Sequence, residues 1–435
     1  MDAAREAALF VLERARRDGA WSSAMADAAK TKYKLDDRSL SLCVTISLGV
    51  LQNMTLCDWY IDKFSKSVSK IEPKVRDILR CAVYQLLFMD KIPESAAVNE
   101  AVMLCKKLGY ARAAGFCNAV LRKLAACADK LPDIPNEGSA QYLSVKYSHP
   151  LWLAEEIMQR RGYDAAKAFF AADNTAPETA LQVNTLKTTT DELMQMLHSA
   201  GIDCKKHDWL PDCIVVSDKV TAMPGFDEGL FYVQDPAARC AVLAARLEAG
   251  MSVLDACAAP GGKSFAAAIA MQNSGSIDSC DLHEKKIRLI EGGAKRLGLS
   301  CINAFAKDAR QAVDKEYDAI IADVPCSGYG VIRKKPEIRY KNRSDCEALP
   351  AIQTAILNNL ASAVKVGGEL IYSTCTVLRE ENEDVVSAFL SAHSEFRAES
   401  FSLPNGECAT EGYITFWPDT HGTDGFFVCK LRRVE

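Results

Sequence analysis

Two cysteines of this chain each follow directly on the end of a predicted strand. Cys326 comes after the apolar run Ala319–Asp323, and Cys375 comes after Glu369–Ser373. The carboxyl ends of parallel strands meet at one edge of a sheet, so the two thiols converge on one pocket if these strands are neighbours. A thiolate is a strong nucleophile that forms covalent adducts with electrophilic carbons. The spacing therefore predicts a site for nucleophilic catalysis with two thiols.

A third strand end carries a turn of small residues. The strand Ser252–Asp255 runs through Pro260, Gly261 and Gly262 into an Ala-rich helix, so that a ligand can approach main-chain N–H groups. Asp281 ends the next strand, about 20 residues further on, where a carboxylate commonly holds the hydroxyl pair of a ribose. The pattern predicts a nucleotide-type cofactor. A tight strand–helix turn without a ligand is the alternative.

The chemistry of this turn narrows the choice of cofactor. Its glycine spacing matches neither a dinucleotide fingerprint nor a triphosphate-binding loop. Asp255 precedes the turn, and its negative charge repels phosphate but attracts a cation. S-adenosylmethionine, which combines a sulfonium, an ammonium, a carboxylate and a ribose, fits these features. Asp308, which follows the predicted strand Ile302–Phe305, stands where an adenine amino group would be met.

Two thiols, a carboxylate and a methyl sulfonium suit methylation at C5 of a cytosine. A thiolate that adds to C6 makes C5 nucleophilic, and a carboxyl group at N3 absorbs the developing charge. Asp323 is the candidate for the N3 contact. One thiol attacks while the other assists release, and this chemistry does not assign the two roles. The alternative is that Cys326 and Cys375 are structural thiols among 17 cysteines.

The composition is that of an ordinary globular protein in a reducing compartment. The 435 residues are 49% hydrophobic and 25% charged, which predicts two or three domains with sizeable cores. The first residues do not resemble a signal peptide, and no apolar run approaches the roughly 20 residues that cross a bilayer. Seventeen cysteines without a secretory signal indicate free thiols, and none has zinc spacing. We expect a cytoplasmic protein without membrane contact or bound metal.

Three regions of different pattern must position the candidate groups. Residues 1–130 show apolar stripes at helical spacing, which predicts an all-α bundle. After a linker rich in Pro, Gly and polar residues, residues 140–235 predict a small α/β unit. Residues 236–435 alternate strand and helix, which predicts a mostly parallel, doubly wound sheet of Rossmann type with ligands at its carboxyl edge. A late hairpin is expected from Gly412–Pro418 and Gly425–Leu431.

The net charge of −5 does not indicate a nucleic-acid partner, but basic residues are concentrated in two stretches. The first includes Lys63, Lys66, Lys70, Lys74, Arg76, Arg80, Lys106, Lys107, Arg112, Arg122 and Lys123. The second includes Arg333, Lys334, Lys335, Arg339, Lys341 and Arg343. Local patches bind phosphates even on an acidic chain. We expect the helical region to help grip RNA, with a solvated helix face as the alternative.

Five motifs together resemble the RsmB family, also called Sun or Fmu, of bacterial 16S rRNA cytosine-5 methyltransferases. They are Asp255–Lys263, Asp323–Ser327, Ser373–Thr376, Glu381–Glu383 and Asp424–Phe427. Residues Ala97–Val102 and Phe116–Arg122 resemble the end of the NusB-like domain with which that family begins. The resemblance covers nearly the whole chain. It implies a NusB-like RNA-binding domain, a small RNA-binding α/β unit, and a methyltransferase domain that acts on 16S rRNA or a small-subunit precursor rather than on DNA.

The resemblance also implies roles for single residues. Cys375 would be the nucleophile and Cys326 would assist release of the methylated product. S-adenosylmethionine would be held by Cys257, Ala258, Ala259, Pro260, Gly261, Gly262, Lys263, Asp281, Asp308 and Asp323. Two positions depart from the family pattern. Ser264 replaces a common Thr and keeps the hydroxyl, whereas Gln182 replaces a common Arg and puts one phosphate contact in doubt.

Three other interpretations compete with an RNA cytosine-5 methyltransferase. A NAD-type dehydrogenase needs a different glycine pattern and would leave both thiols unused. A non-catalytic RNA-binding or assembly protein would not need Asp255, Asp281, Asp323 and the two cysteines intact. A DNA cytosine methyltransferase would normally carry only the thiol after a proline, so that Cys375 would be superfluous. The sequence therefore favours the RNA enzyme.

Overall fold

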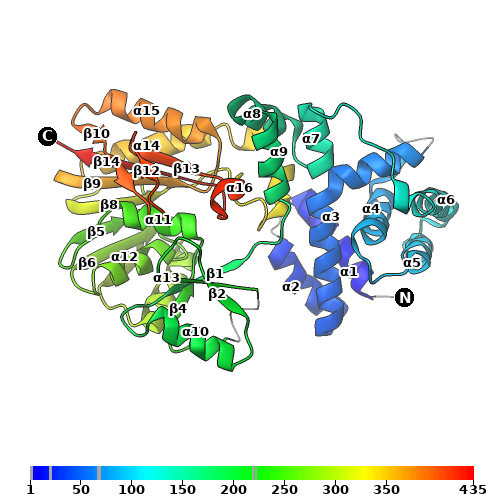
Figure 1. Cartoon of the computed structure of the whole chain (residues 1–435), viewed down its shortest axis with the longest axis horizontal. Helices are drawn as coiled ribbons and strands as arrows, with labels where there is room; N and C mark the ends of the chain where they lie inside the picture. The colour runs from blue at the N-terminus through cyan, green and yellow to red at the C-terminus, as the bar shows by residue number, and fades with distance from the viewer. Residues whose placement is uncertain (1–2, 19–21, 66–69, 218–219, 221–222) are drawn as a thin grey trace. The chain divides into compact units, whose positions relative to one another are not determined.

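The computed structural model describes residues 3–18, 22–65, 70–217, 220 and 223–435. The chain forms two compact units (Figure 1). The first combines Met1–Thr175 with the short segment Ile332–Lys341, and the second combines Ala176–Val331 with Asn342–Glu435. The three ranges expected from the sequence remain a prediction, because the division by contacts separates two units rather than three regions.

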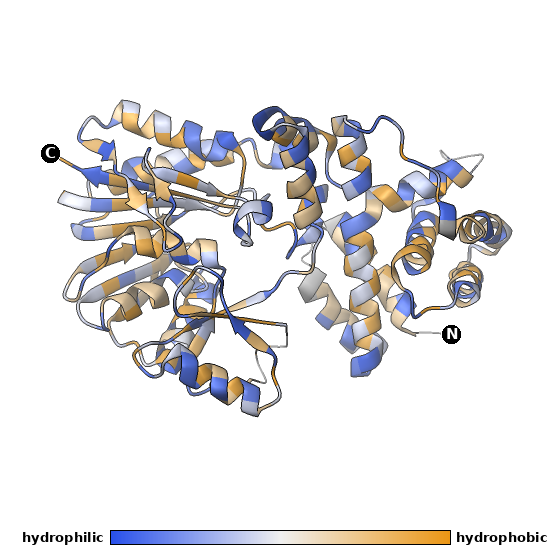
Figure 2. Cartoon of the chain, in the orientation of Figure 1, coloured by the Kyte–Doolittle hydropathy of each residue, from blue (hydrophilic) through white to orange (hydrophobic). Residues whose placement is uncertain are grey.

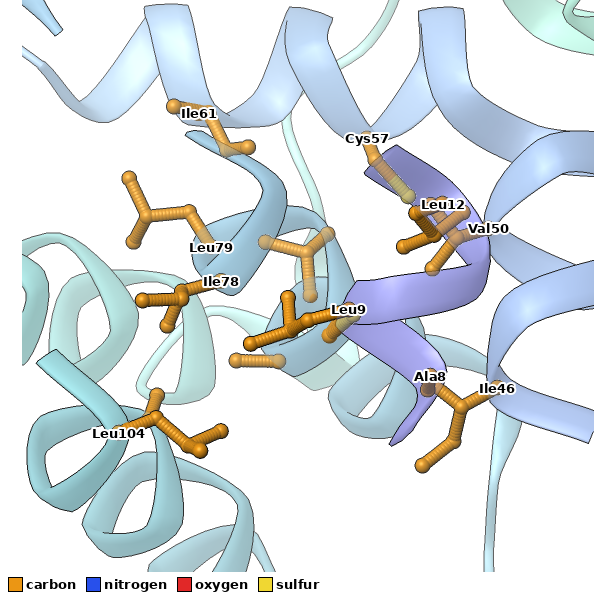
Figure 3. Packing of buried hydrophobic residues seen from close by; sticks show 14 of the residues in the cluster. Ala8, Leu9, Leu12, Ile46, Val50, Cys57, Ile61, Ile78, Leu79 and Leu104 are labelled. Atoms are coloured by element: carbon orange, nitrogen blue, oxygen red, sulfur yellow. The ribbon is translucent and has the colours of Figure 1, made fainter. Parts of the chain in front are cut away.

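The first unit is built from helices, as the apolar stripes predicted. Its described α-helices are α1 (Ala3–Asp18), α2 (Ser22–Tyr33), α3 (Asp37–Phe64), α4 (Pro73–Phe88), α5 (Glu94–Lys107), α6 (Ala114–Ala125), α7 (Ala140–Tyr147), α8 (Leu151–Arg161) and α9 (Tyr163–Ala172). The stripe of α1 is buried, and Figure 3 shows its Leu9 packed near Val50 of α3 and Ile78 of α4. The all-α prediction for this region is confirmed.

Helix α3 needs separate mention because of its length and apolar character. By length and composition alone it could cross a membrane, which the inspection of apolar runs did not reveal. Half of its apolar window is buried inside the first unit. Figure 2 shows hydrophilic turns interleaved with hydrophobic ones along the helices of this unit. A long helix with one buried stripe is what a helical bundle uses for its core.

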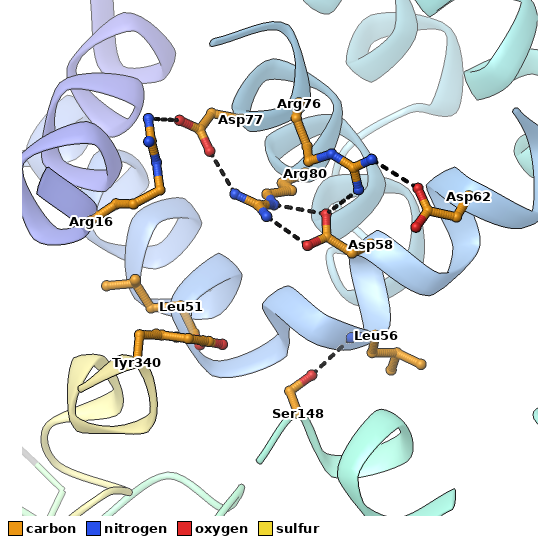
Figure 4. Close-up of polar contacts among 10 residues, drawn as sticks. All are labelled: Arg16, Leu51, Leu56, Asp58, Asp62, Arg76, Asp77, Arg80, Ser148 and Tyr340. Atoms are coloured by element: carbon orange, nitrogen blue, oxygen red, sulfur yellow. Dashed lines mark hydrogen bonds and ion pairs between the residues drawn. The ribbon is translucent and has the colours of Figure 1, made fainter. Parts of the chain in front are cut away.

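An ion-pair network joins α1, α3 and α4 (Figure 4). Its members are Arg16, Asp58, Asp62, Arg76, Asp77 and Arg80. Arg80 lies at the centre, where its guanidinium donates to Asp58 at 2.5 and 2.8 Å and to Asp77 at 2.8 Å. Burial by itself lowers the pKa of Arg80, but the hydrogen bonds and charges of these carboxylates raise it overall. The network therefore keeps its buried charges ionised and paired.

This network changes the picture of the first basic stretch. Arg76 and Arg80 are neutralised by carboxylates, and Lys74 and Lys107 pair with glutamates of α1. Lys66 lies outside the described residues. The exposed cations of α5 to α6 are Lys106, Arg112, Arg122 and Lys123. Any phosphate contact from this stretch is therefore expected from these four positions and from the exposed Lys63 and Lys70, rather than from Arg76 and Arg80.

The segment Ile332–Lys341, which we call the strap, leaves the second unit and packs within the first. Arg339 is 2% exposed. Its guanidinium donates to the carbonyl oxygens of Gln52, Tyr147 (3.3 Å) and Asp173 (3.4 Å) and to the side chain of Asn174 (2.6 Å). Tyr340 of the strap donates its hydroxyl to Leu51 O at 2.7 Å (Figure 4). Arg339 of the second basic stretch is therefore buried and makes structural hydrogen bonds, so it does not belong to a basic surface.

The second unit begins with a small antiparallel sheet in the order β2-β3-β1-β4. The strands are β1 (Thr179–Val183), β2 (Cys204–Lys206), β3 (Cys213–Val216) and β4 (Phe231–Val233), and α10 (Thr190–Ser199) accompanies them. Gln182, the departure from the family pattern, is buried in β1 and donates to Gln234 O at 3.0 Å. The predicted α/β unit is confirmed.

The large sheet has the order β10-β14-β9-β8-β5-β6-β7, with β13 paired to β14. Its parallel strands are β5 (Ser252–Asp255), β6 (Ser276–Asp281), β7 (Ile302–Ala306), β8 (Tyr317–Asp323) and β9 (Val364–Thr374). β10 (Phe396–Ala398), β13 (Tyr413–Phe416) and β14 (Phe426–Arg433) are antiparallel to their neighbours. The doubly wound sheet and the late hairpin are confirmed.

Helices cover both faces of this sheet, as the alternation of side chains requires. The helices are α11 (Pro236–Ala244), α12 (Gly262–Ala270), α13 (Glu284–Leu297), α14 (Leu349–Ala361), α15 (Glu383–Ala392) and the short α16 (Pro418–His421). Ala319 and Ile321 of β8 pack with α12 and α13, whereas Ile320 and Ala322 pack with α14 and α15. Both faces are buried, and the carboxyl edge of the strands is left to bind ligands.

Candidate active site

The two thiols lie together because β8 and β9 are neighbouring strands. The register pairs Asp323 with Ser373, so Cys326 and Cys375 follow from the same edge of the sheet. The sulfur atoms are 3.0 Å apart, and the N–H of Cys375 donates to Cys326 Sγ at 3.3 Å. Both side chains are half-buried. The condition on which the two-thiol interpretation depended is met.

Asp323 is held between a lysine and a hydroxyl. Lys263 Nζ donates to Asp323 Oδ2 at 2.6 Å, and Ser373 Oγ donates to Oδ1 at 3.0 Å. Lys263 is 8% exposed, and its ammonium lies 5.1 Å from the ring centroid of Phe426. The sequence placed both Lys263 and Asp323 with the cofactor, and the two side chains contact each other at the edge of the sheet. A partly buried charge pair of this kind fixes the orientation of Asp323.

A third loop approaches the thiols with its backbone. Gly425 N donates to Gly330 O at 2.8 Å, and Gly330 N donates to Cys375 O at 3.0 Å. A Cβ atom on Gly330 would stand 1.9 Å from Gly425 O, which no real contact allows. Glycine is therefore required where these backbones meet. The Asp424–Phe427 motif thus lies beside the loops of Cys326 and Cys375.

The surroundings of Cys326 disfavour its ionised form. Its hydrogen bond with Cys375 raises the pKa of the Cys326 thiol well above its ordinary value, and burial adds to the effect. The negative charges of Cys375, Glu381 and Asp323 raise it further. A second thiolate next to a first would place two like charges at 3.0 Å. The surroundings therefore favour the neutral thiol form of Cys326.

A cavity of about 410 Å³ lies at the carboxyl edge of the parallel strands. Five of the predicted cofactor residues line it: Cys257, Ala259, Asp281, Asp308 and Asp323. Leu282, Pro325, Ile352 and Ile356 add apolar walls. Ala258, Pro260, Gly261 and Gly262 belong to the turn behind it. The size and the mixture of apolar walls with a few carboxylates are those of a small-molecule site.

Asp281 and Asp308 differ in the hydrogen bonds that their carboxylates already accept. Asp281 accepts from His283 N at 3.0 Å, and Lys286 stands 3.7 Å away. Asp308 accepts two-pronged hydrogen bonds from Arg310, the shortest at 2.7 Å, and these bonds lower the pKa of Asp308. An adenine amino group at Asp308 would compete with that guanidinium. Arg310 is thus a residue of the site that the sequence patterns did not reveal.

The turn itself is built around a glycine and a buried carboxylate. Gly261 has φ of +112°, and a Cβ there would stand 2.4 Å from the Phe265 ring. Asp255 is fully buried and accepts from Ser264 Oγ at 2.7 Å, while its Oδ1 has no hydrogen-bond partner among the described residues. Burial raises the pKa of Asp255 to about 6, against the opposing effects of Ser264 and Lys263. Ser264, the departure from the family Thr, keeps the hydroxyl function.

Metal and disulfide chemistry find no support in the described part of the chain. No group of three or more His, Cys, Asp or Glu side chains there is placed to hold a metal ion. The seventeen cysteines are free thiols.

Comparison with known proteins identifies the domains and relatives of this chain. The family described as 16S rRNA methyltransferase RsmB/F matches residues 242–432, the NusB family matches residues 2–126, and the ferredoxin-like domain of RsmF/B-like methyltransferases matches residues 149–222. The probable ribosomal RNA small subunit methyltransferase B of Bacillus subtilis is 35% identical, over 99% of this chain and 98% of its own length. The protein of the same name from Synechocystis is 31% identical over 100% of both chains.

Solved structures show the same arrangement. The crystal structure of PH0851 superposes with a TM-score of 0.79 and 27% identity, and the match covers 98% of each chain. Relatives at this level of identity that match from end to end share both domain content and ancestry. The chain therefore belongs to the RsmB/F family of 16S rRNA methyltransferases.

Proposed function

We propose that this protein methylates C5 of a cytosine in 16S rRNA, with S-adenosylmethionine as the methyl donor. One observation carries the proposal: Cys326 and Cys375 lie 3.0 Å apart beside Asp323, which also lines the cavity at the sheet edge. Two thiols and a carboxylate around one base are what C5 methylation of a pyrimidine needs. A dehydrogenase would have no use for them.

The residues of the cavity fit S-adenosylmethionine. Asp281 stands at the end of β6, where a ribose hydroxyl pair is bound, and Asp308 follows β7 at the adenine position. The unpartnered buried oxygen of Asp255 supplies negative potential at the turn, which suits a cationic ligand and not a phosphate. When bound, this cofactor supplies an electrophilic methyl group on sulfur.

Cys375 is assigned the attack on C6 of the cytosine. Its thiolate forms the S–C6 bond, and the electron pair of the C5–C6 double bond moves to C5, which then takes the methyl group. Asp323 faces N3, and Lys263 balances its charge, so that the developing charge of the base is stabilised by a preorganised pair. The role of Lys263 at the base is thus more direct than one at the cofactor.

Release requires that a base take the proton from C5. The electron pair of that C–H bond then re-forms the C5–C6 double bond as the S–C6 bond breaks, which regenerates the Cys375 thiolate. Cys326 is assigned to assist this step, since it is the one group within hydrogen-bond distance of Cys375 Sγ among the described side chains. The site therefore separates attack and release between two sulfurs that share one proton.

The substrate is proposed to be 16S rRNA or a small-subunit precursor, which places the protein in the cytoplasm. Exposed cations of the helical unit, such as Lys106, Arg112 and Lys123, are the candidates for phosphate contacts there. Neither a metal, nor a membrane, nor DNA has a role in this scheme.

Bisulfite mapping of 16S rRNA from cells with and without the gene tests the reaction. One cytosine should lose its protection from deamination when the gene is absent. The variant Cys326→Ala should accumulate a covalent protein–RNA adduct with cofactor present, seen as a slowly migrating band, because attack proceeds and release stalls. An unchanged methylation map, or a variant that turns over without an adduct, contradicts the proposal.

A further inference from the structure

The family motif Glu381–Glu383 has no role in the scheme above, although it lies directly behind the thiols. Glu381 ends a short 3-10 turn, Arg379–Glu381, and Asn382 precedes helix α15. Both side chains are 0% exposed. A buried glutamate and a buried asparagine side by side require a reason, because burial of unpaired polar groups is unfavourable.

Glu381 holds the loop of Cys326 from both sides, together with Gln353 of α14. Its Oε2 accepts from Ser327 N at 2.9 Å and from Gln353 Nε2 at 2.8 Å. Gln353 Nε2 in turn donates to Pro325 O at 3.0 Å. The residue before Cys326 and the residue after it are thereby fixed to one carboxylate.

Asn382 holds the loop of Cys375 in the same manner. Its Oδ1 accepts from Thr374 Oγ1 at 2.6 Å, and its Nδ2 donates to Thr376 O at 3.0 Å. The residues on both sides of Cys375 are therefore fixed to one amide. An asparagine at the start of a helix often accepts a hydrogen bond from a backbone N–H of that helix. Asn382 makes no such bond to α15, and its side chain bonds instead to the loop that carries Cys375.

We propose that Glu381 and Asn382 form a two-residue clamp that sets the distance between the two thiols and, by placing a charge under one of them only, decides which thiol ionises. Adjacent residues cannot move independently, so the spacing of the loops that they hold is fixed by one peptide unit. The loops are also joined by the bond from Ser327 Oγ to Thr376 Oγ1 at 2.9 Å.

The charge asymmetry follows from the two side chains. The carboxyl of Glu381 lies behind Cys326, whereas a neutral amide lies behind Cys375. Other groups also face Cys326: Asp323 from β8, Tyr372 from β9, and Lys263 from α12 through its bond to Asp323. Cys326 is thus kept as a thiol that can give and take a proton. This inference rests on the proposed function only for the assignment of attack and release to the two cysteines. The hydrogen bonds of the clamp and the position of its carboxyl group do not depend on a substrate.

Thiol alkylation by iodoacetamide tests the clamp without RNA or cofactor. The alkylation rate of Cys326 and Cys375 is measured by peptide mapping across pH, on the whole protein. In the unaltered protein Cys375 should react at lower pH than Cys326. In Glu381→Gln, which keeps the shape and removes the charge, the pH midpoint of Cys326 should fall by about one unit, as expected for loss of a like charge at close range. Glu380→Gln, in the exposed neighbour that pairs with Arg343, is the matched control.

A charge exchange sharpens the test. In the double variant Glu381→Gln/Asn382→Asp the carboxylate moves from behind Cys326 to behind Cys375, and the order of the two midpoints should reverse. Asn382→Ala should lower kcat of methyl transfer by about 10²-fold with KM nearly unchanged, since a displacement of about 1 Å at a reacting group has that effect. Asn382→Asp serves if the alanine variant does not fold.

The outcomes separate this inference from the proposed reaction. An unshifted Cys326 midpoint in Glu381→Gln, an equal shift in Glu380→Gln, or a Cys326 that ionises first in the unaltered protein overturns the clamp, whatever the methylation map shows. Shifted midpoints with an unchanged methylation map in cells support the clamp and overturn the reaction.

Discussion

The two units each bury a cluster of charged side chains. The clusters differ in whether the charged groups are paired with groups of opposite charge. In the helical unit Arg80 faces two carboxylates, and Asp77 faces two guanidinium groups. Around the thiols, Glu381 faces amide and peptide N–H groups, and Asp255 faces one hydroxyl. The difference appears in the pKa values: pairing keeps Arg80 charged, while burial raises the pKa of Asp255 and of Glu381.

This contrast separates stability from chemistry. A cluster of paired charges favours one arrangement of its helices. It does not form a binding site for a ligand, because each charge already has an ion-pair partner. A cluster with unmatched carboxyls and thiols stores unfavourable electrostatics that a substrate or cofactor can relieve. Changes in the first cluster should therefore act on folding alone, whereas changes in the second should act on reaction and binding as well as on stability.

The largest expected effect comes from the reactive sulfur. Cys375→Ala should lower methyl transfer by about 10³-fold or more, because the proposed nucleophile is removed and the raised pKa of the remaining Cys326 thiol disfavours its ionised form. Calorimetry should show cofactor binding unchanged and the free energy of unfolding nearly unchanged, since the side chain is half-buried. Measurable turnover of this variant on its RNA would remove Cys375 as the nucleophile.

The helical network should respond in the opposite sense. Asp77→Asn leaves Arg80 and Arg16 short of a charge partner, and Asp77 is 2% exposed. We expect a loss of roughly 3 kcal/mol in the free energy of unfolding of the helical unit, measured by denaturant titration. Asp37→Asn breaks the Lys30–Asp37 pair, whose aspartate side chain is 93% exposed, and should change stability by less than about 1 kcal/mol. Equal effects in the two variants would remove the distinction drawn here.

Asp255 predicts a dependence of stability on pH. Its pKa is about 6 in the folded protein against an ordinary 3.8, so the unfolded chain ionises first as pH rises. The contribution of this group to stability therefore falls between about pH 4 and pH 6, by up to ~3 kcal/mol, and is constant above. Asp255→Asn should flatten the unfolding free energy over that range relative to the unaltered protein. Parallel pH profiles of the two proteins would contradict the raised pKa.

The smallest effect is expected at the rim of the cavity. The Arg310 guanidinium donates exposed hydrogen bonds to the Asp308 carboxylate. An adenine amino group that binds Asp308 has to replace these hydrogen bonds. Arg310→Met should therefore tighten cofactor binding a few-fold in calorimetry, because an exposed pair is a weak competitor. Weaker binding would mean that Arg310 itself holds the cofactor.

The sequence predicted the bounds of single strands better than it predicted which strands are adjacent in the sheet. The bounds of β5 and β6 agree with the expected ones, since apolar runs there end at an aspartate. β9 begins at Val364 rather than Glu369, because the polar and glycine residues before Glu369 do not read as strand and the register with β8 shifts there. Nothing local says that β8 and β9 are adjacent, and the meeting of the thiols depends on that adjacency.

Side-chain direction was the other limit. Lys263 and Asp323 were both expected at the cofactor, but the sequence does not show that their side chains contact each other, because tertiary packing sets that contact. Arg310 is two residues from Asp308 and reads as an ordinary exposed cation. Glu381 and Asn382 were visible only as a motif, because their partners come from α14 and the ends of β8 and β9.

The strap has a practical consequence for anyone who divides this protein. It starts six residues after Cys326, yet its Arg339 is satisfied only by backbone oxygens and an amide of residues 52–174. A truncated protein that starts at Ala176 would leave these ten residues in a loop close to Cys326, with the Arg339 guanidinium deprived of its partners. Loss of activity on such truncation would then report a misplaced loop and not a missing RNA contact. The helical half can be removed cleanly only by two cuts, with a short flexible bridge in place of Ile332–Lys341.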